Sequence, residues 1–120
     1  MENDQTIVAL ASLFFSSKLK GLCEQAGFTY KGAIGPSGLL QRIKEHDPVA
    51  ILLDLDKDDI EIQTIVHSIK EQTSSPIIAF CGHVATEQLE EARTCGCDVV
   101  TTNGAITGSF ESVIQKALTN

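Results

Sequence analysis

The segment VAILLDLD, residues 49–56, opens with five consecutive apolar residues and then turns acidic at Asp54. An apolar run without alternating polar residues is typical of a strand buried on both faces, as the central strands of parallel sheets are. A second run of this kind, PIIAF at residues 76–80, follows after a stretch of helical character. The two runs predict a parallel sheet that helices cover on both sides.

The rest of the chain alternates between short apolar runs and amphipathic stretches. Three more strands are expected at Thr6–Ala11, Phe28–Ile34 and Val99–Thr102. Apolar residues at helical spacing predict a helix after each strand, and these helices are expected at Leu13–Ala26, Ser37–His46, Ile62–Ile69, Ala85–Ala92 and Ile106–Leu118. This alternation predicts an α/β fold, a doubly wound (βα)5 three-layer sandwich with a five-stranded parallel sheet. We expect residues 1–120 to form a single domain.

Several residues predict where the helices begin and end. Gly27 and Gly96 stand where glycine commonly ends a helix, and Ser37 is a candidate N-cap. A calcium loop after the third strand would need a glycine turn and a glutamate at its twelfth position, and neither follows. We interpret the acids there as the start of the third helix, where the helix dipole favours negative charge, with Asp56 or Asp58 as its cap. The acids at the helix start are Asp58, Asp59 and Glu61, and together with Asp54 and Asp56 they crowd the end of the third strand and the start of this helix.

The charge balance limits the classes of partner. The chain has 9 Lys and Arg residues against 16 Asp and Glu residues, a formal net charge of −7. Such a chain is repelled by phosphate backbones and anionic lipids, so we expect neither nucleic-acid nor membrane binding. No apolar run approaches the length of a membrane span, and the four cysteines are expected to be free thiols in a reducing compartment. We therefore expect a cytoplasmic protein.

Three segments each contain a predicted strand and the residues that follow it. Functional residues of parallel α/β sheets gather at these strand ends. VAILLDLD resembles the third strand of bacterial receiver domains, which ends in a phosphoacceptor aspartate, here Asp54. PIIAFCG (76–82) is similar to the fourth strand, and GCDVVTTNG (96–104) looks like the segment G-A-D-x-x-x-x-K-P of that family. In length and element order, the chain resembles the CheY-like receiver domain of response regulators over essentially its full length. The resemblance implies a flavodoxin-like, receiver-like fold.

The same resemblance identifies functional groups that are missing. In the family, two acidic residues after the first strand hold Mg²⁺ together with the acceptor, and the metal neutralises charge during phosphoryl transfer. A hydroxyl at the end of the fourth strand contacts the phosphoryl group, a lysine after the fifth strand pairs with it, and an aromatic residue acts as a switch. The corresponding positions here hold Leu10, Ala11 and Ser12 (acidic pair), Cys81 (hydroxyl), Asn103 (lysine) and Val100 (aromatic switch). The chain thus resembles a degenerate receiver, or pseudo-receiver.

This pattern implies a signalling module without enzymatic activity, metal or cofactor. We expect it to act through contacts with a signalling protein, such as a histidine kinase or an output protein. The resemblance suggests docking on the face of the last helices and fifth strand, with exposed polar positions in Thr86–Arg93 and Thr102–Ser112. An alternative hypothesis is an atypical receiver that is phosphorylated on Asp54 in a two-component phosphorelay. A third is a small flavodoxin-like ligand binder that uses the loops Ser12–Ser17 and Gly32–Gly38.

Two cysteine patterns offer other chemistry. Cys95 and Cys97 have a spacing that suits a soft metal, but no second pair of ligands accompanies them. A helix C-terminus, where they are expected, disfavours the thiolate form, so we interpret Cys97 as a core residue. A nucleophilic pair of Cys81 and His83 would need a third group to orient the histidine, and the sequence indicates none.

Overall fold

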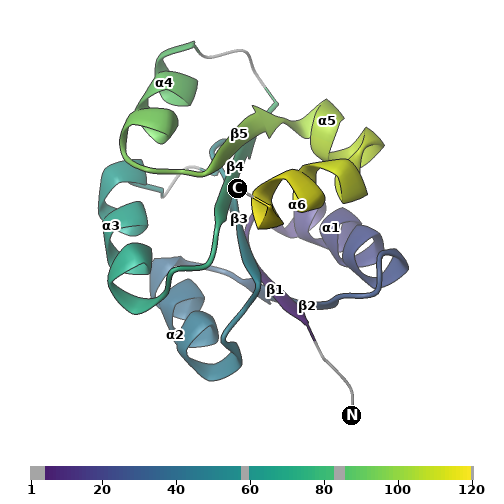
Figure 1. Ribbon diagram of the computed structural model, residues 1–120. Coiled ribbons are helices and arrows are strands. Elements are labelled where there is room, and N and C mark those ends of the chain that lie inside the picture. Colours follow the sequence, from purple (N-terminus) through teal and green to yellow (C-terminus); the bar gives the residue numbers. More distant parts are fainter. Residues whose placement is uncertain (1–4, 58–59, 83–85, 120) are drawn as a thin grey trace.

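Five parallel strands run through the middle of the molecule in the order β2-β1-β3-β4-β5 (Figure 1). The computed structural model describes residues 5–57, 60–82 and 86–119. The strands are β1 (Thr6–Leu10), β2 (Thr29–Ala33), β3 (Ala50–Asp54), β4 (Ile77–Cys81) and β5 (Val99–Thr102). The helices are α1 (Leu13–Gln25), α2 (Pro36–His46), α3 (Ile62–Gln72), α4 (Thr86–Thr94), α5 (Asn103–Gly108) and α6 (Phe110–Leu118). The predicted doubly wound α/β fold with a five-stranded parallel sheet is confirmed.

Side chains of the central strands alternate between two cores, one on each face of the sheet. In β1, Ile7 and Ala9 belong to the core beneath α1, α5 and α6, whereas Val8 and Leu10 belong to the core beneath α2, α3 and α4. The two groups of helices lie on opposite sides of the sheet (Figure 1). Strands β1, β3 and β4 are buried along their whole length, as the unbroken apolar runs predict for β3 and β4.

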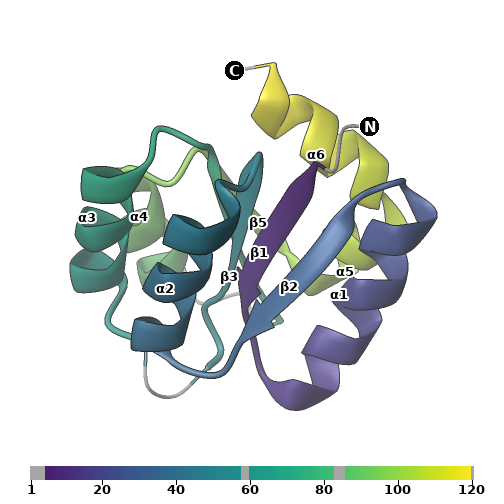
Figure 2. The same cartoon turned by 90° about the horizontal axis from the view of Figure 1, so that it is seen from below.

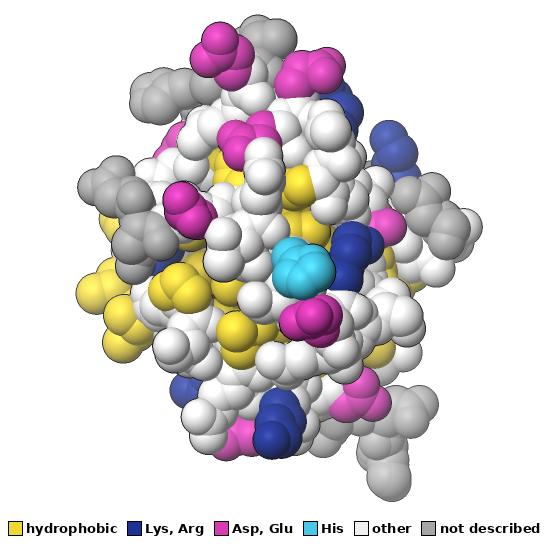
Figure 3. Space-filling model, turned by 90° about the vertical axis from the view of Figure 1, so that its left-hand side faces the viewer, with side chains coloured by type: hydrophobic (Ala, Val, Ile, Leu, Met, Phe, Trp, Pro, Cys, Tyr) yellow, Lys and Arg dark blue, Asp and Glu magenta, His cyan; other side chains and the backbone are white. Residues whose placement is uncertain are grey.

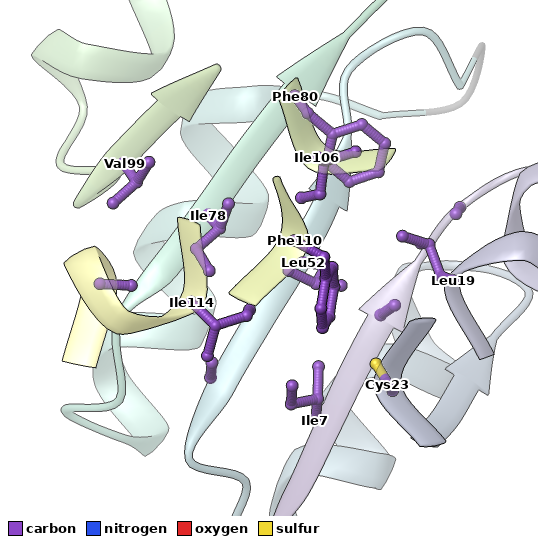
Figure 4. Packing of buried hydrophobic residues seen from close by; sticks show 14 of the residues in the cluster. Ile7, Leu19, Cys23, Leu52, Ile78, Phe80, Val99, Ile106, Phe110 and Ile114 are labelled. Atoms are coloured by element: carbon purple, nitrogen blue, oxygen red, sulfur yellow. The ribbon is translucent and has the colours of Figure 1, made fainter. Parts of the chain in front are cut away.

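The core beneath α1, α5 and α6 contains two packed aromatic rings. Phe15 of α1 and Phe80 of β4 have ring centroids 5.1 Å apart, at an angle of 36°. Ile106 of α5, Phe110 of α6 and Leu19 of α1 belong to the same cluster, and Figure 4 shows how they lie around the strands. The tilted arrangement of the rings is one that aromatic pairs favour beyond the burial of their area.

Glycines end two of the helices, as the sequence predicts. Gly27 follows α1 with φ of 91° and Gly96 follows α4 with φ of 113°, a backbone conformation that other residues rarely adopt. The predicted start of α2 is wrong, because Gly35 is the N-cap and Pro36 is the first helical residue. Proline at this position already has the φ of a helix, so the helix begins before Ser37.

The predicted cap of α3, Asp56 or Asp58, is also wrong, although Glu61 stands at the helix N-terminus as expected. This helix begins at Ile62, with Glu61 as an N-cap residue that makes no side-chain capping hydrogen bond. Instead, the Glu61 carboxylate accepts a hydrogen bond from the Thr64 hydroxyl at 3.0 Å. Asp58 and Asp59 lie outside the described residues.

The C-terminal part of the chain forms two short helices where one was predicted. Thr102 caps α5 through its hydroxyl, which accepts from Ala105 N at 3.1 Å. The helical conformation breaks at Ser109, with φ of −138° and ψ of 44°, directly after Gly108. Glycine and serine favour helix ends over interiors, and the break lets both Ile106 and Phe110 reach the core. Within the described ranges, no helix combines the length and apolar character needed to cross a membrane.

A matched pair of substitutions tests the buried aromatic ring. Phe80 is fully buried, whereas the Phe14 side chain is 83% exposed. We expect Phe80→Ala to lower the free energy of unfolding by about 3–5 kcal/mol, because the lost contacts leave a cavity. Phe14→Ala should change it by no more than about 0.5 kcal/mol. Urea unfolding of both variants measures the difference, and equal losses would contradict the assigned core.

Candidate functional site

The ends of four neighbouring strands bring the predicted site positions to one edge of the sheet. Leu10 pairs with Leu53 and Asp54 with Phe80, so β1, β3 and β4 end side by side. Cys81 pairs with Thr102, which places the end of β5 next to that of β4. The loops that follow these strands therefore meet around Asp54, as expected for the carboxyl edge of a parallel sheet.

Asp54 is a buried carboxylate held by backbone donors. Its side chain is only 4% exposed. One oxygen, Oδ2, accepts from Ser12 N at 3.3 Å, and Oδ1 accepts from Asp56 N at 3.0 Å. Burial raises the pKa of Asp54, the two backbone N–H groups and the positive charge of Lys57 oppose that rise, and the charge of Asp56 adds to it. Asp54 thus joins the loops after β1 and β3 through hydrogen bonds, and little of its side chain is accessible to a reagent.

Asp56 connects the loops after β3 and β4. Its Oδ2 atom accepts from the backbone N–H of Gly82 at 2.6 Å, a short charge-assisted hydrogen bond. A Cβ atom at Gly82 would lie 3.1 Å from Asp56 Oδ2 and 2.8 Å from Asn103 Nδ2, so glycine is what permits this approach. The prediction of Asp56 as the cap of α3 is therefore wrong. Sequence spacing did not identify this contact, because Gly82 becomes a neighbour only through the pairing of β3 with β4.

The three positions of the acidic pair have structural roles. Leu10 and Ala11 are buried, one in each core of the sheet. Ser12 is exposed and is the N-cap of α1, where its hydroxyl accepts from Phe15 N at 3.3 Å. None of the three contributes a carboxylate. Among the described residues, no group of three or more His, Cys, Asp or Glu side chains is arranged to hold a metal ion.

The other three departures from the receiver pattern lie in β4, in β5 and at the start of α5. Cys81 is fully buried in the core beneath α2, α3 and α4, and Val100 packs against the same core. Asn103, at the lysine position, is the first residue of α5, and its amide nitrogen lies beside Gly82. Its Oδ1 atom is buried and accepts no hydrogen bond from any described residue. The edge of the sheet therefore has a neutral amide where a receiver has a cation.

The alternative ligand loops have hydroxyls that are already engaged. Ser12 caps α1, and Ser16 Oγ lies 2.5 Å from the Tyr30 hydroxyl, within hydrogen-bonding distance. The stretch Gly32–Gly38 covers the end of β2 and the first residues of α2. Two hydroxyls of the loop Ser12–Ser17 are therefore engaged within the protein, and these contacts add no support to the hypothesis of a flavodoxin-like ligand binder.

The thiols of Cys95 and Cys97 lie on the core side of the α4–β5 connection. Both pack against the core beneath α2, α3 and α4. Burial raises the pKa of Cys97 to about 12 and also raises the pKa of Cys95. A thiol that stays protonated at neutral pH is a poor nucleophile and a poor metal ligand. His83, the proposed partner of Cys81, lies outside the described residues.

Comparison with known proteins identifies the fold. No protein-family model matches the sequence, and no curated protein matches it. A response regulator receiver domain protein from Clostridium thermocellum superposes with a TM-score of 0.83 at 17% identity, covering 96% of this chain and 94% of its own. A CheY-like receiver domain protein from Methanospirillum hungatei gives 0.81 at 17% identity, with 98% and 95% covered. The chemotaxis protein CheY4 of Vibrio cholerae gives 0.83 at 14% identity, with 97% and 100% covered. The chain has the CheY-like flavodoxin fold.

The raised pKa of Asp54 predicts a pH dependence of stability. A raised pKa means that the folded state binds this proton more tightly than the unfolded state, so ionisation of Asp54 costs stability. Asp54→Asn keeps the shape of the side chain but removes the ionisation. We expect the stability of the wild type, relative to this variant, to be greatest in acid and to decrease as pH rises through the raised pKa.

Urea unfolding of both proteins between about pH 4 and pH 8 measures this trend. Asp47→Asn, at an exposed carboxylate that follows α2, is the matched control for the loss of one negative charge. A constant difference between wild type and Asp54→Asn across that range would contradict the raised pKa.

Proposed function

We propose that this chain is a receiver-like signalling domain that works through protein–protein contacts and does not depend on Mg²⁺-dependent phosphorylation of Asp54. The proposal treats residues 1–120 as one cytoplasmic module without catalytic activity. Its partner would be a signalling protein, such as a histidine kinase or an output protein. The CheY-like fold supports a signalling role, since the superposed receiver domains share it over nearly their full lengths.

The observation that carries the proposal is the hydrogen bond from Gly82 N to the Asp56 carboxylate. This negative group lies between the ends of β3 and β4, next to Asp54, and joins their two loops at 2.6 Å. Gln88 of α4 adds a second tie by donating to the Leu55 carbonyl at 3.0 Å. An anion supplied by the chain itself thus holds Gly82, directly after β4, against the loop after β3 without added phosphate.

Among the described residues, the groups that phosphoryl transfer requires are largely missing at this edge of the sheet. Transfer needs the charge of the phosphoryl group to be neutralised and its oxygens to be positioned. Leu10 and Ala11 supply no metal ligand, Cys81 turns into the core, and Asn103 has no charge. Asp56 adds a negative charge beside Asp54, which opposes the approach of another anion.

The proposed docking surface is formed by α4, β5 and α5. In α4, Glu87, Glu90 and Glu91 are exposed, and acidic side chains gather in the upper part of the face that Figure 3 shows, where α4 lies. Exposed Thr102 and Gly104 continue the surface at the start of α5. Val100 is too small to act as an aromatic switch between two positions, so this surface is proposed to stay in one form.

A phosphoryl mimic tests the independence from phosphorylation. We expect titration of the wild type with Mg²⁺ and beryllium fluoride to give no saturable NMR shifts around Asp54 at low millimolar metal, because cationic partners are missing. Asp54→Asn is the control. Saturable shifts in the wild type that this variant loses, or a stable mass increase on Asp54 after incubation with a cognate kinase, would instead support the phosphoacceptor hypothesis.

Two substitutions at Asp56 test the internal anion. Asp56→Ala leaves Gly82 N without its acceptor, and we expect a loss of about 1 kcal/mol in stability together with faster amide exchange at Gly82. Asp56→Asn keeps one acceptor oxygen and should lose less than Asp56→Ala. Hydrogen exchange followed by NMR gives the comparison. Wild-type exchange at Gly82 in Asp56→Ala would show that the loop is held by other contacts.

A further inference from the structure

A hollow of about 320 Å³ lies at the open edge of the sheet, beside β2. Strand β2 is the last strand on this side, with α1 on one face of the sheet and α2 on the other (Figure 2). Three cationic residues line the hollow, one from each of these elements: Lys20 of α1, Lys31 of β2 and Arg42 of α2. Its lining therefore reaches around the edge of the sheet from both faces.

The charge of this hollow is opposite to that of the whole chain. The chain has a net charge of −7, yet among the described residues no carboxylate lines the hollow. Each of four other hollows on the described surface is lined by at least one acidic residue. Within the described residues, neither Lys20, Lys31 nor Arg42 forms an ion pair with a carboxylate. Three cations gathered without a carboxylate partner among the described residues make this edge complementary to a negatively charged group.

The inner wall of the hollow is fixed by hydrogen bonds. Arg42 Nε donates to the Gly32 carbonyl at 3.3 Å, which holds the guanidinium against the edge of β2. On the other face, Ser16 and Tyr30 are joined through their hydroxyls. A Cβ atom at Gly32 would lie 3.0 Å from Ser16 Oγ and 3.2 Å from the Tyr30 hydroxyl oxygen, so the absence of a side chain keeps this wall compact.

Two large apolar side chains form the rim. Leu13 is 79% exposed and Ile34 is 78% exposed, and both line the hollow. Aliphatic side chains of this size normally gain by burial, and their placement beside cations is typical of a surface that binds another chain. A small inorganic anion would use the cations but would leave both apolar side chains in water.

We propose that this hollow binds an extended acidic segment of a partner protein, with carboxylates toward Lys20, Lys31 and Arg42 and an apolar side chain against Leu13 and Ile34. An extended chain suits the site because its side chains alternate in direction, so that it reaches cations on both faces of the sheet. The site is separate from Asp54 and Asp56 and does not depend on the function proposed for them.

The test uses an eight-residue peptide of alternating Glu and Leu, with a Gln-and-Leu peptide of the same length as its control. We expect saturable NMR shifts at Lys20, Lys31 and Gly32 with the acidic peptide only. The affinity of that peptide should decrease as the NaCl concentration is raised, because salt screens the charges. The double variant K20Q/K31Q should weaken binding by at least about fivefold, since it removes two ion pairs. K18Q/K44Q is the matched control, because it removes the same charge from exposed lysines outside the hollow.

A second pair of variants tests the apolar rim. Ile34→Ser should also weaken binding of the acidic peptide, whereas Leu118→Ser, which changes an exposed residue outside the hollow, should not.

Several outcomes would overturn the proposal. Equal binding of the Gln peptide, or equal losses in K20Q/K31Q and K18Q/K44Q, would show that the cations do not select the ligand. Equal shifts with inorganic phosphate, without an effect of Ile34→Ser, would make the hollow a small-anion site. Self-association in ultracentrifugation that K20Q/K31Q abolishes would assign the hollow to a second copy of the chain.

Discussion

Burial of the central strands on both faces is the constraint on which the rest of the structure depends. Ile51, Leu52 and Leu53 leave no solvated side of β3, so helices must cover the sheet above and below. Right-handed crossovers then bring all strands in parallel and their carboxyl ends to one edge. Asp54 lies at that edge because it is the first polar residue after the apolar run. The location of the candidate site thus follows from the hydrophobic pattern, before any polar residue is considered.

The chain has the CheY-like fold, and contacts within the chain occupy the polar edge of its sheet. A site for phosphoryl transfer has to leave its anion-binding donors open for the substrate. Here the donors around Asp54 and Asp56 are satisfied by the chain itself, through Ser12, Asp56 and Gly82. The buried Asp54 and the exposed Asp56 therefore connect the loops after β1, β3 and β4 through hydrogen bonds. The same residue types at the same edge can serve either role, and the difference lies in which donors remain free.

The sequence predicted the sheet and its helices well because hydrophobic periodicity and glycine are strong local signals. Gly27 and Gly96 end α1 and α4 as predicted, since glycine adopts a positive φ at little steric cost. The start of α2 was missed because Pro36, a stronger signal at the first helical position, competes with Ser37. Such local signals do not predict contacts between residues that are distant in the sequence. The bond from Gly82 to Asp56 and the cluster of Lys20, Lys31 and Arg42 depend on which strands and helices become neighbours.

The break at Ser109 has a consequence for the order in which the chain acquires structure. Helices α5 and α6 have 6 and 9 residues, well below the roughly 12–15 residues at which isolated helices become stable in water. Each therefore depends on contacts of Ile106 and Phe110 with the sheet. Residues 103–118 are consequently templated by strands that precede them in the chain, and their helices complete the cover of one face of the sheet.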